Sequence, residues 1–205
     1  MAVALFCSAW TRWRRPGRKY PARTDIDPAA IGALLPYVFI VQCEAPLRFR
    51  MRLAGEAVLH LYGRGLIGQV LDEGLPPPLG NFASDRSAQV VSEGRGLWSS
   101  GTVHLLSGRT MPTDRVILPL AEHDGQIDHL IGLIHHPADG FPSSPWAGEV
   151  IRSAWLKLPA PDQDWFELPS LEVEPPVEVR APERRRRVPR LQLAPDQAIA
   201  TVVTG

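Results

Sequence analysis

The sequence predicts an α+β domain built on one five-stranded antiparallel sheet with short helices on one face. Between Arg48 and Leu53, arginines alternate with apolar residues, which is the period-two pattern of a strand with one buried face. Three further apolar segments, at 98–106, 115–120 and 127–135, are separated by glycine-containing turns and resemble an antiparallel meander. Helix-like segments stand between the two groups of strands, an order that favours helices packed on one sheet.

The first element is a short amphipathic helix over residues 5–14, because apolar residues recur there at three- and four-residue spacings and Pro16-Gly17 follows. Trp10 and Trp13 belong to its apolar stripe. We expect this helix to cover the polar face of the sheet.

A second helix should begin at Asp27 and Pro28. Aspartate is a preferred N-cap, and proline fits the first helical position because its missing N–H costs nothing there. Pro36 disfavours helical geometry at the preceding residue, so the chain should become extended and form a strand over 37–42. Helices are also predicted over 56–62 and 79–93, each followed by glycine.

The C-terminal third predicts a separate organisation. Residues 144–158 have a helical apolar stripe that includes Trp146, Val150, Ile151 and Trp155, which predicts an amphipathic interaction helix. Residues 159–205 are rich in proline and charge and should be largely disordered. The expected units are therefore a domain over 5–137, a helix over 144–158 and a tail over 159–205.

Composition restricts the class of protein. The chain has 205 residues, 44% of them apolar, and its 22 basic and 22 acidic residues cancel. A neutral chain of this size favours one globular core and gives no global attraction to nucleic acid or membrane. The two cysteines lack metal-site spacing and fit a reducing compartment, and no signal peptide or membrane span is evident. We therefore expect a cytoplasmic protein without a membrane or nucleic-acid partner.

The N-terminal quarter carries a family resemblance. Its core is Tyr20-Pro21-Ala22-Arg23-Thr24-Asp25-Ile26-Asp27-Pro28, with Leu34-Leu35-Pro36-Tyr37-Val38-Phe39-Ile40 and then Arg48-Phe49-Arg50-Met51-Arg52-Leu53-Ala54-Gly55. These stretches resemble a PAS-like domain family (PAS_5 type) found mainly in alphaproteobacterial proteins. The resemblance implies a PAS fold over residues 5–137 and a sensory or interaction role. The signature positions are Trp10, Trp13, Pro21, Arg23, Asp25, Asp27, Pro28, Pro36, Arg50, Arg52 and Gly55.

The charged signature residues favour a structural role. We expect Arg23 and Asp25 to meet Arg50 and Arg52 near the edge of the polar sheet face, in ion pairs that orient the segment. Asp27 is already explained as a helix cap, so an acid/base pair of aspartates is the weaker reading.

A ligand pocket, if present, should lie between the sheet and the short helices. The candidate lining residues are Phe39, Met51, Leu61, Phe82, Trp98, His104 and Leu118. Haem would require an axial imidazole, for which His60 or His104 could serve, although a histidine on a strand or helix is more often a satisfied or exposed side chain. The six histidines show no metal-site spacing, and neither cysteine lies in the helix motif that flavin photochemistry of the LOV type requires. No metal or resident cofactor is therefore predicted.

The leading functional prediction is a non-enzymatic, cytoplasmic PAS-like module that senses or docks in bacterial signalling. Its partner, either another protein or a second copy, would bind the C-terminal helix. The alternative is a chemosensor that binds a small molecule or haem. A weaker alternative assigns cyclic-dinucleotide or nucleic-acid contact to the basic run 184–190, which more simply is a solvated tail.

Overall fold

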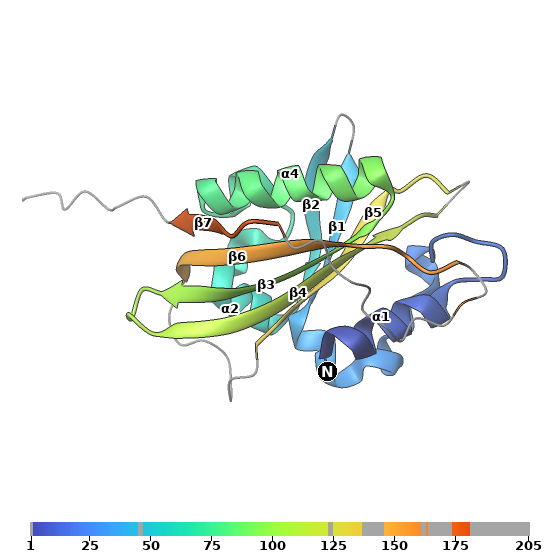
Figure 1. Cartoon of the computed structure of the whole chain (residues 1–205), viewed down its shortest axis with the longest axis horizontal. Helices are drawn as coiled ribbons and strands as arrows, with labels where there is room; N and C mark the ends of the chain where they lie inside the picture. Colours follow the sequence, from blue (N-terminus) through green and yellow to red (C-terminus); the bar gives the residue numbers. More distant parts are fainter. Residues whose placement is uncertain are drawn as a thin grey trace, which may run out of the picture.

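The chain folds around one curled, seven-stranded antiparallel sheet (Figure 1). The structure is a computed structural model that describes residues 2–44, 47–122, 125–136, 146–160, 163 and 174–180. The strands are β1 Val38–Glu44, β2 Arg48–Ala54, β3 Gly96–Leu105, β4 Thr110–Leu120, β5 His129–His135, β6 Trp146–Leu156 and β7 Val177–Arg180. Their order across the sheet is β2-β1-β5-β4-β3-β6-β7. The α+β class is confirmed, but the expected count of five strands is wrong.

The predicted interaction helix over 144–158 is wrong, because Trp146–Leu156 forms β6. This strand pairs with β3 along its length, from Leu156 opposite Gly96 to Trp146 opposite Leu105. Without β6, β3 would present an unpaired row of backbone groups. Apolar residues lie on both faces of β6, and such a run does not distinguish a buried strand from a helix by its periodicity.

The four residues predicted to form the apolar stripe of the interaction helix are instead distributed along strand β6. Trp146 and Ile151 are buried in the core between the sheet and α4, and Trp155 packs partly against that core. Val150 is half-buried. These residues therefore pack in or beside the domain core, and the described residues 146–156 form no amphipathic helix.

The last described strand, β7, lies within the segment predicted to be largely disordered. Residues 177–180 pair with β6, with Val177 opposite Ile151 and Arg180 opposite Gly148. The other tail residues that the structure describes are 159–160, 163 and 174–176. The basic run 184–190 lies outside the described residues.

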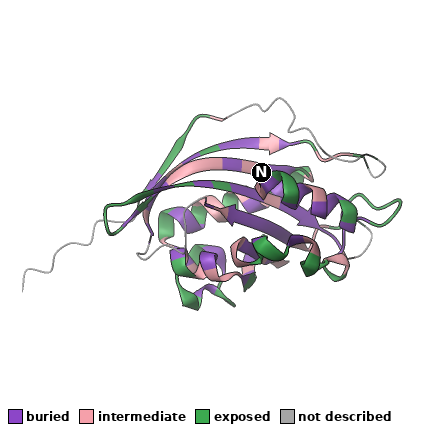
Figure 2. Ribbon diagram, turned by 90° about the horizontal axis from the view of Figure 1, so that it is seen from below, coloured by how far each residue is buried: buried purple, intermediate pink, exposed green. Residues whose placement is uncertain are grey.

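One face of the sheet is covered by α2 Glu56–Tyr62, α3 Leu71–Gly74 and α4 Pro77–Glu93. The bounds of α2 are those predicted, whereas α4 begins two residues earlier than expected, with Pro77 in its first turn. Val58, Leu71 and Val90 pack against inward residues of the strands. Figure 2 shows the resulting pattern, with buried positions along the strands and exposed positions on the outer sides of the helices.

The opposite face is covered by α1 Ala2–Trp13 and by a 3₁₀ helix, η2 Pro28–Tyr37. Trp10 is fully buried, and its indole N–H donates to the carbonyl of Pro119 over 3.0 Å. Helix α1 lies on the sheet face that carries Arg50 and Arg52, as predicted. On that face it packs over apolar residues of β4 and β5 and not over the arginines of β2.

The start of η2 follows the predicted capping. The Asp27 carboxylate accepts a hydrogen bond from the N–H of Ala29 over 3.0 Å, and Pro28 occupies the first position. Pro36 lies inside the 3₁₀ helix and does not end it, so the predicted strand start at residue 37 is wrong: the chain becomes extended only at Val38. Short 3₁₀ turns also occur at η1 Arg23–Asp25 and η3 Arg64–Leu66. In the described part of the chain, helices are too short or too polar to cross a membrane.

Candidate functional site: a cavity bordered by buried charges

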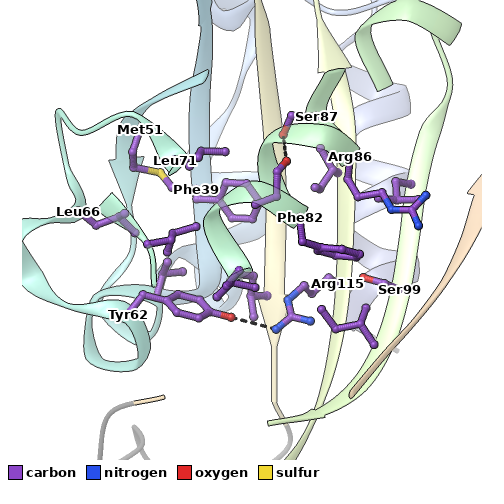
Figure 3. A pocket seen from close by; sticks show the side chains of 18 residues that line it. Phe39, Met51, Tyr62, Leu66, Leu71, Phe82, Arg86, Ser87, Ser99 and Arg115 are labelled. Atoms are coloured by element: carbon purple, nitrogen blue, oxygen red, sulfur yellow. Dashed lines mark hydrogen bonds between the residues drawn. The ribbon is translucent and has the colours of Figure 1, made fainter. Parts of the chain in front are cut away.

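A cavity of about 80 Å³ lies between the sheet and helices α2, α3 and α4 (Figure 3). Its wall is almost entirely apolar. The strands contribute Phe39, Met51, Leu97, Ile117, Ile134 and Ile151, and the helices and the connections between them contribute Val58, Leu66, Leu71, Leu75, Leu79, Phe82 and Ala83. Five polar side chains interrupt this wall, those of Tyr62, Arg86, Ser87, Ser99 and Arg115.

The predicted pocket residues are divided among three places. Phe39, Met51 and Phe82 lie in the cavity wall, and Leu61 is buried in the adjoining core. The prediction is wrong for the other three, which do not reach the cavity. Trp98 and Leu118 pack on the opposite face with α1, and His104 is exposed on β3.

A buried charged cluster borders the cavity on the side of β4 and β6. Arg115 on β4 forms an ion pair with Glu149 on β6, and its Nη2 donates to the hydroxyl of Tyr62 on α2 over 2.9 Å. The Thr113 hydroxyl donates to Glu149 Oε1 over 3.1 Å. Glu149 is fully buried, and Arg115 is 9% exposed. Figure 3 shows Arg115 and Tyr62 directed toward each other along the cavity wall.

Arg115 and Tyr62 keep their protons around neutral pH. Burial opposes the charge on Arg115, but the attraction of Glu149 and the hydrogen bonds outweigh burial and raise the arginine's pKa. Burial raises the pKa of Tyr62 to about 12, although the nearby Arg115 charge acts in the opposite direction. Arg115 therefore stays charged and Tyr62 stays a neutral phenol.

A second ion pair lies where α4 meets the C-terminal segment. Arg86 of α4 pairs with Glu174 at 2.5 Å, and the indole N–H of Trp155 donates to the same carboxylate over 3.0 Å. The Glu174 backbone N–H donates to the Ser153 carbonyl on β6 over 2.8 Å. We call β6, residues 174–176 and β7 the C-terminal ribbon. Each arginine in the cavity wall thus pairs with a carboxylate of this ribbon.

Tyr62, Arg115 and Glu149 were not among the site residues predicted from the sequence. Arg115 carried a usable signal, because it stands at an inward position of β4 between the inward residues Thr113 and Ile117. A charge at such a position requires a buried partner. Its partner could not be identified, since Glu149 was assigned to a helix.

The residues of the cavity do not fit haem. His60 is exposed and its ring contacts the carbonyl oxygen of Glu56 in its own helix, and His104 is exposed as well. Histidine is absent from the cavity wall. Among the residues that the structure describes, no group of three or more histidine, cysteine or acidic side chains could hold a metal ion. The described wall of the cavity therefore offers no axial imidazole.

Neither cysteine is placed for chemistry in the cavity. Burial raises the pKa of Cys7 to about 12, and burial with the nearby Asp128 charge raises the pKa of Cys43 to about 12. The rings of His135 and His136, at the end of β5, both contact Tyr37, at centroid distances of 5.1 and 5.2 Å, and His136 is buried.

The expected ion pairs between the signature and β2 are wrong. Asp25 pairs with Arg15 after α1, at 2.5 Å. Arg50 pairs with Glu44 across the β1–β2 hairpin, at 2.7 Å, and Arg52 donates to Gln42. The neighbouring strand supplies partners for the β2 arginines, so the signature is not needed there. Arg23 is exposed.

The signature is anchored to the sheet by its backbone. The N–H of Ala121, just after β4, donates to the carbonyl of buried Pro21 over 3.0 Å. The N–H of Gly55 donates to Val38 at the start of β1 over 2.8 Å. Trp13 is buried beside Phe6 in the core under α1. These contacts hold the signature against the sheet.

Asp25 supplies a testable local contribution. Its carboxylate, whose side chain is 6% exposed, accepts from the Ala22 N–H at 3.1 Å in addition to pairing with Arg15. We expect Asp25→Ala to lower the free energy of unfolding by about 1 kcal/mol, as loss of a cap does. Arg15→Gln should change it by less than about 0.5 kcal/mol, because Arg15 is largely exposed. Urea unfolding measures both, and equal effects would contradict the backbone role of Asp25.

An antiparallel sheet with helices packed around a pocket on one face defines the class as an α+β domain with a pocket between its two layers. A family model described as a PAS domain matches residues 1–135, and the chain belongs to this family. The match contains β1 to β5, in the order β2-β1-β5-β4-β3, and ends before β6. Neither the curated proteins nor the solved structures contain a match to the chain.

Proposed function

We propose that this chain is a non-enzymatic sensory or interaction module of bacterial signalling, working in the cytoplasm, whose input is a small molecule in the cavity. Membership of the PAS family supports a signalling role. The observation that carries the proposal is the cavity itself, an apolar space with the hydrogen-bonded Arg115 and Tyr62 in its wall. A small number of polar groups that converge in an apolar pocket is typical of ligand sites.

The chemistry of the cavity supports binding over turnover. Tyr62, with its raised pKa, does not exchange a proton readily near neutral pH. Arg115 and Glu149 form an ion pair with each other. A site of this kind orients a ligand with fixed donors and has no group poised as acid, base or nucleophile.

We further propose that the C-terminal ribbon is the output. Ligand entry changes the packing around Arg86 and Arg115, and both are paired with ribbon carboxylates, Glu174 and Glu149. A partner protein or a second copy of the chain would respond to the ribbon. This replaces the expected contact through a C-terminal helix.

Filling the cavity tests the function. Ala83 of α4 lines the cavity, and we expect Ala83→Leu to abolish binding of small fragments to the full chain while costing no more than about 3 kcal/mol of stability. Fragment binding is measured by NMR shifts of the methyl groups of Ile117 and Leu97, with Val179 reporting on the ribbon. Asn81→Leu, at an exposed position of the same helix, is the matched control and should bind normally.

Two results would contradict the proposed function. One is that no fragment of a diverse set shifts the cavity methyl groups of the wild-type chain. The other is that Ala83→Leu binds the same fragments as the wild type, which would place binding elsewhere.

A further inference from the structure

The size of the cavity limits what it can hold. An engineered cavity of about 150 Å³ binds benzene, which has six heavy atoms. The cavity here, about 80 Å³, is roughly half as large, so it has room for about three or four heavy atoms by the same proportion.

Charge is the second restriction. Arg115 and Glu149 neutralise each other, and Glu149 Oε2 lacks a hydrogen-bond partner in the described structure. Arg86 is likewise neutralised by Glu174. An anionic ligand would leave the buried cluster with excess negative charge, and a cationic ligand would be repelled by the adjacent Arg115. Buried charge without compensation is strongly unfavourable, so an uncharged ligand is favoured.

Tyr62 supplies the third restriction. Its hydroxyl accepts a hydrogen bond from Arg115 over 2.9 Å, while its own proton has no acceptor among the described residues. The adjacent Arg115 charge makes the phenol a better donor. A ligand oxygen beside Tyr62 would satisfy this proton, and the rest of the ligand would contact apolar side chains such as Ile117 and Phe82.

We infer that the cavity selects an uncharged molecule of about four heavy atoms that carries one acceptor oxygen, with Tyr62 donating to that oxygen. Small ketones, aldehydes and ethers belong to this class. The inference rests on the proposed function, because it specifies the ligand of the same cavity.

Three probes with four heavy atoms each test the inference: acetone, isobutane and acetate. They present a neutral acceptor, no acceptor and a charged acceptor in similar shapes. We expect acetone to shift the methyl resonances of Ile117 and Ile134 in the full chain and to bind about fivefold more tightly than isobutane, the typical gain from one net hydrogen bond. Acetate should leave these resonances unchanged.

The role of Tyr62 is tested separately. Tyr62→Phe should reduce acetone affinity below that of isobutane, because the ketone oxygen would then be buried without a donor, and should leave isobutane affinity unchanged. If this variant does not fold, the Tyr62 ring carbon bearing the hydroxyl serves as the readout in the wild type. Its resonance should shift with acetone and not with isobutane.

The outcomes separate the inference from the proposed function. Isobutane binding as tightly as acetone, or acetate binding in the cavity, would overturn the inference and leave a ligand cavity. Absence of binding by acetone, with other fragments still binding in the cavity, would also overturn it. If neither these probes nor any fragment bound there, the proposed function itself would fail.

Discussion

Replacing Glu149 with glutamine is expected to lower the free energy of unfolding by about 3–5 kcal/mol, the usual cost of breaking a buried ion pair. The variant leaves Arg115 charged, with only 9% of its surface exposed, and without its counter-charge. The glutamine can still accept a hydrogen bond from Thr113, so the effect isolates the charge. Burial makes this loss larger than that of any exposed pair in the protein.

A matched control lies on the next strand. Glu178 pairs with Arg180 on β7, where both side chains are more than half exposed. Glu178→Gln should change the free energy of unfolding by less than about 1 kcal/mol. Chemical denaturation of the full chain measures both variants. Equal small effects of the two variants would contradict a buried ion pair at Glu149. The double variant Arg115→Met, Glu149→Met should recover most of the stability that Glu149→Gln loses, because it leaves no buried charge.

Gly55→Ala is expected to cost about 2–3 kcal/mol, toward the upper end of the overpacking range. A Cβ at this position would lie 2.3 Å from the carbonyl oxygen of Pro36 and 2.5 Å from that of Leu35. Both are backbone atoms and cannot rotate away. The hydrogen bond from the Gly55 N–H to Val38 fixes the approach, so relief requires moving the start of β1.

Gly32 in η2 provides the comparison. A Cβ at Gly32 would meet nothing within 4 Å, so Gly32→Ala should be neutral or stabilise by up to about 1 kcal/mol through a less flexible unfolded chain. Thermal and urea unfolding distinguish the two substitutions. Similar stability of both variants would mean that the backbone around Pro36 can shift to make room for the added methyl group.

Local sequence signals predicted elements whose determinants are local. The arginine alternation identified β2, Asp27 with Pro28 identified the start of η2, and the bounds of α2 followed from its stripe and Gly63. Each of these depends on residues within one or two turns. The α+β class followed from their order.

The elements and residues that were predicted wrongly depend on contacts with distant parts of the chain. β6 has apolar residues on both faces, so only its pairing with the distant β3 makes it a strand. Trp98 and Leu118 were assigned to the cavity because their neighbours Leu97 and Ile117 are also apolar. Helix α1 covers one face of the sheet and α4 the other, so apolar residues are buried on both faces. Alternation of apolar and polar residues therefore does not show which residue faces the cavity.

The position of β6 also bears on where this domain can be cut. A recombinant fragment ending at residue 135, where the family match stops, would keep Arg115 and lose the carboxylate that neutralises it. It would also leave β3 as an open edge, a template for intermolecular strand pairing. The segment recognisable by its family is therefore shorter than the cooperative folding unit, and boundaries for expression should extend through β7.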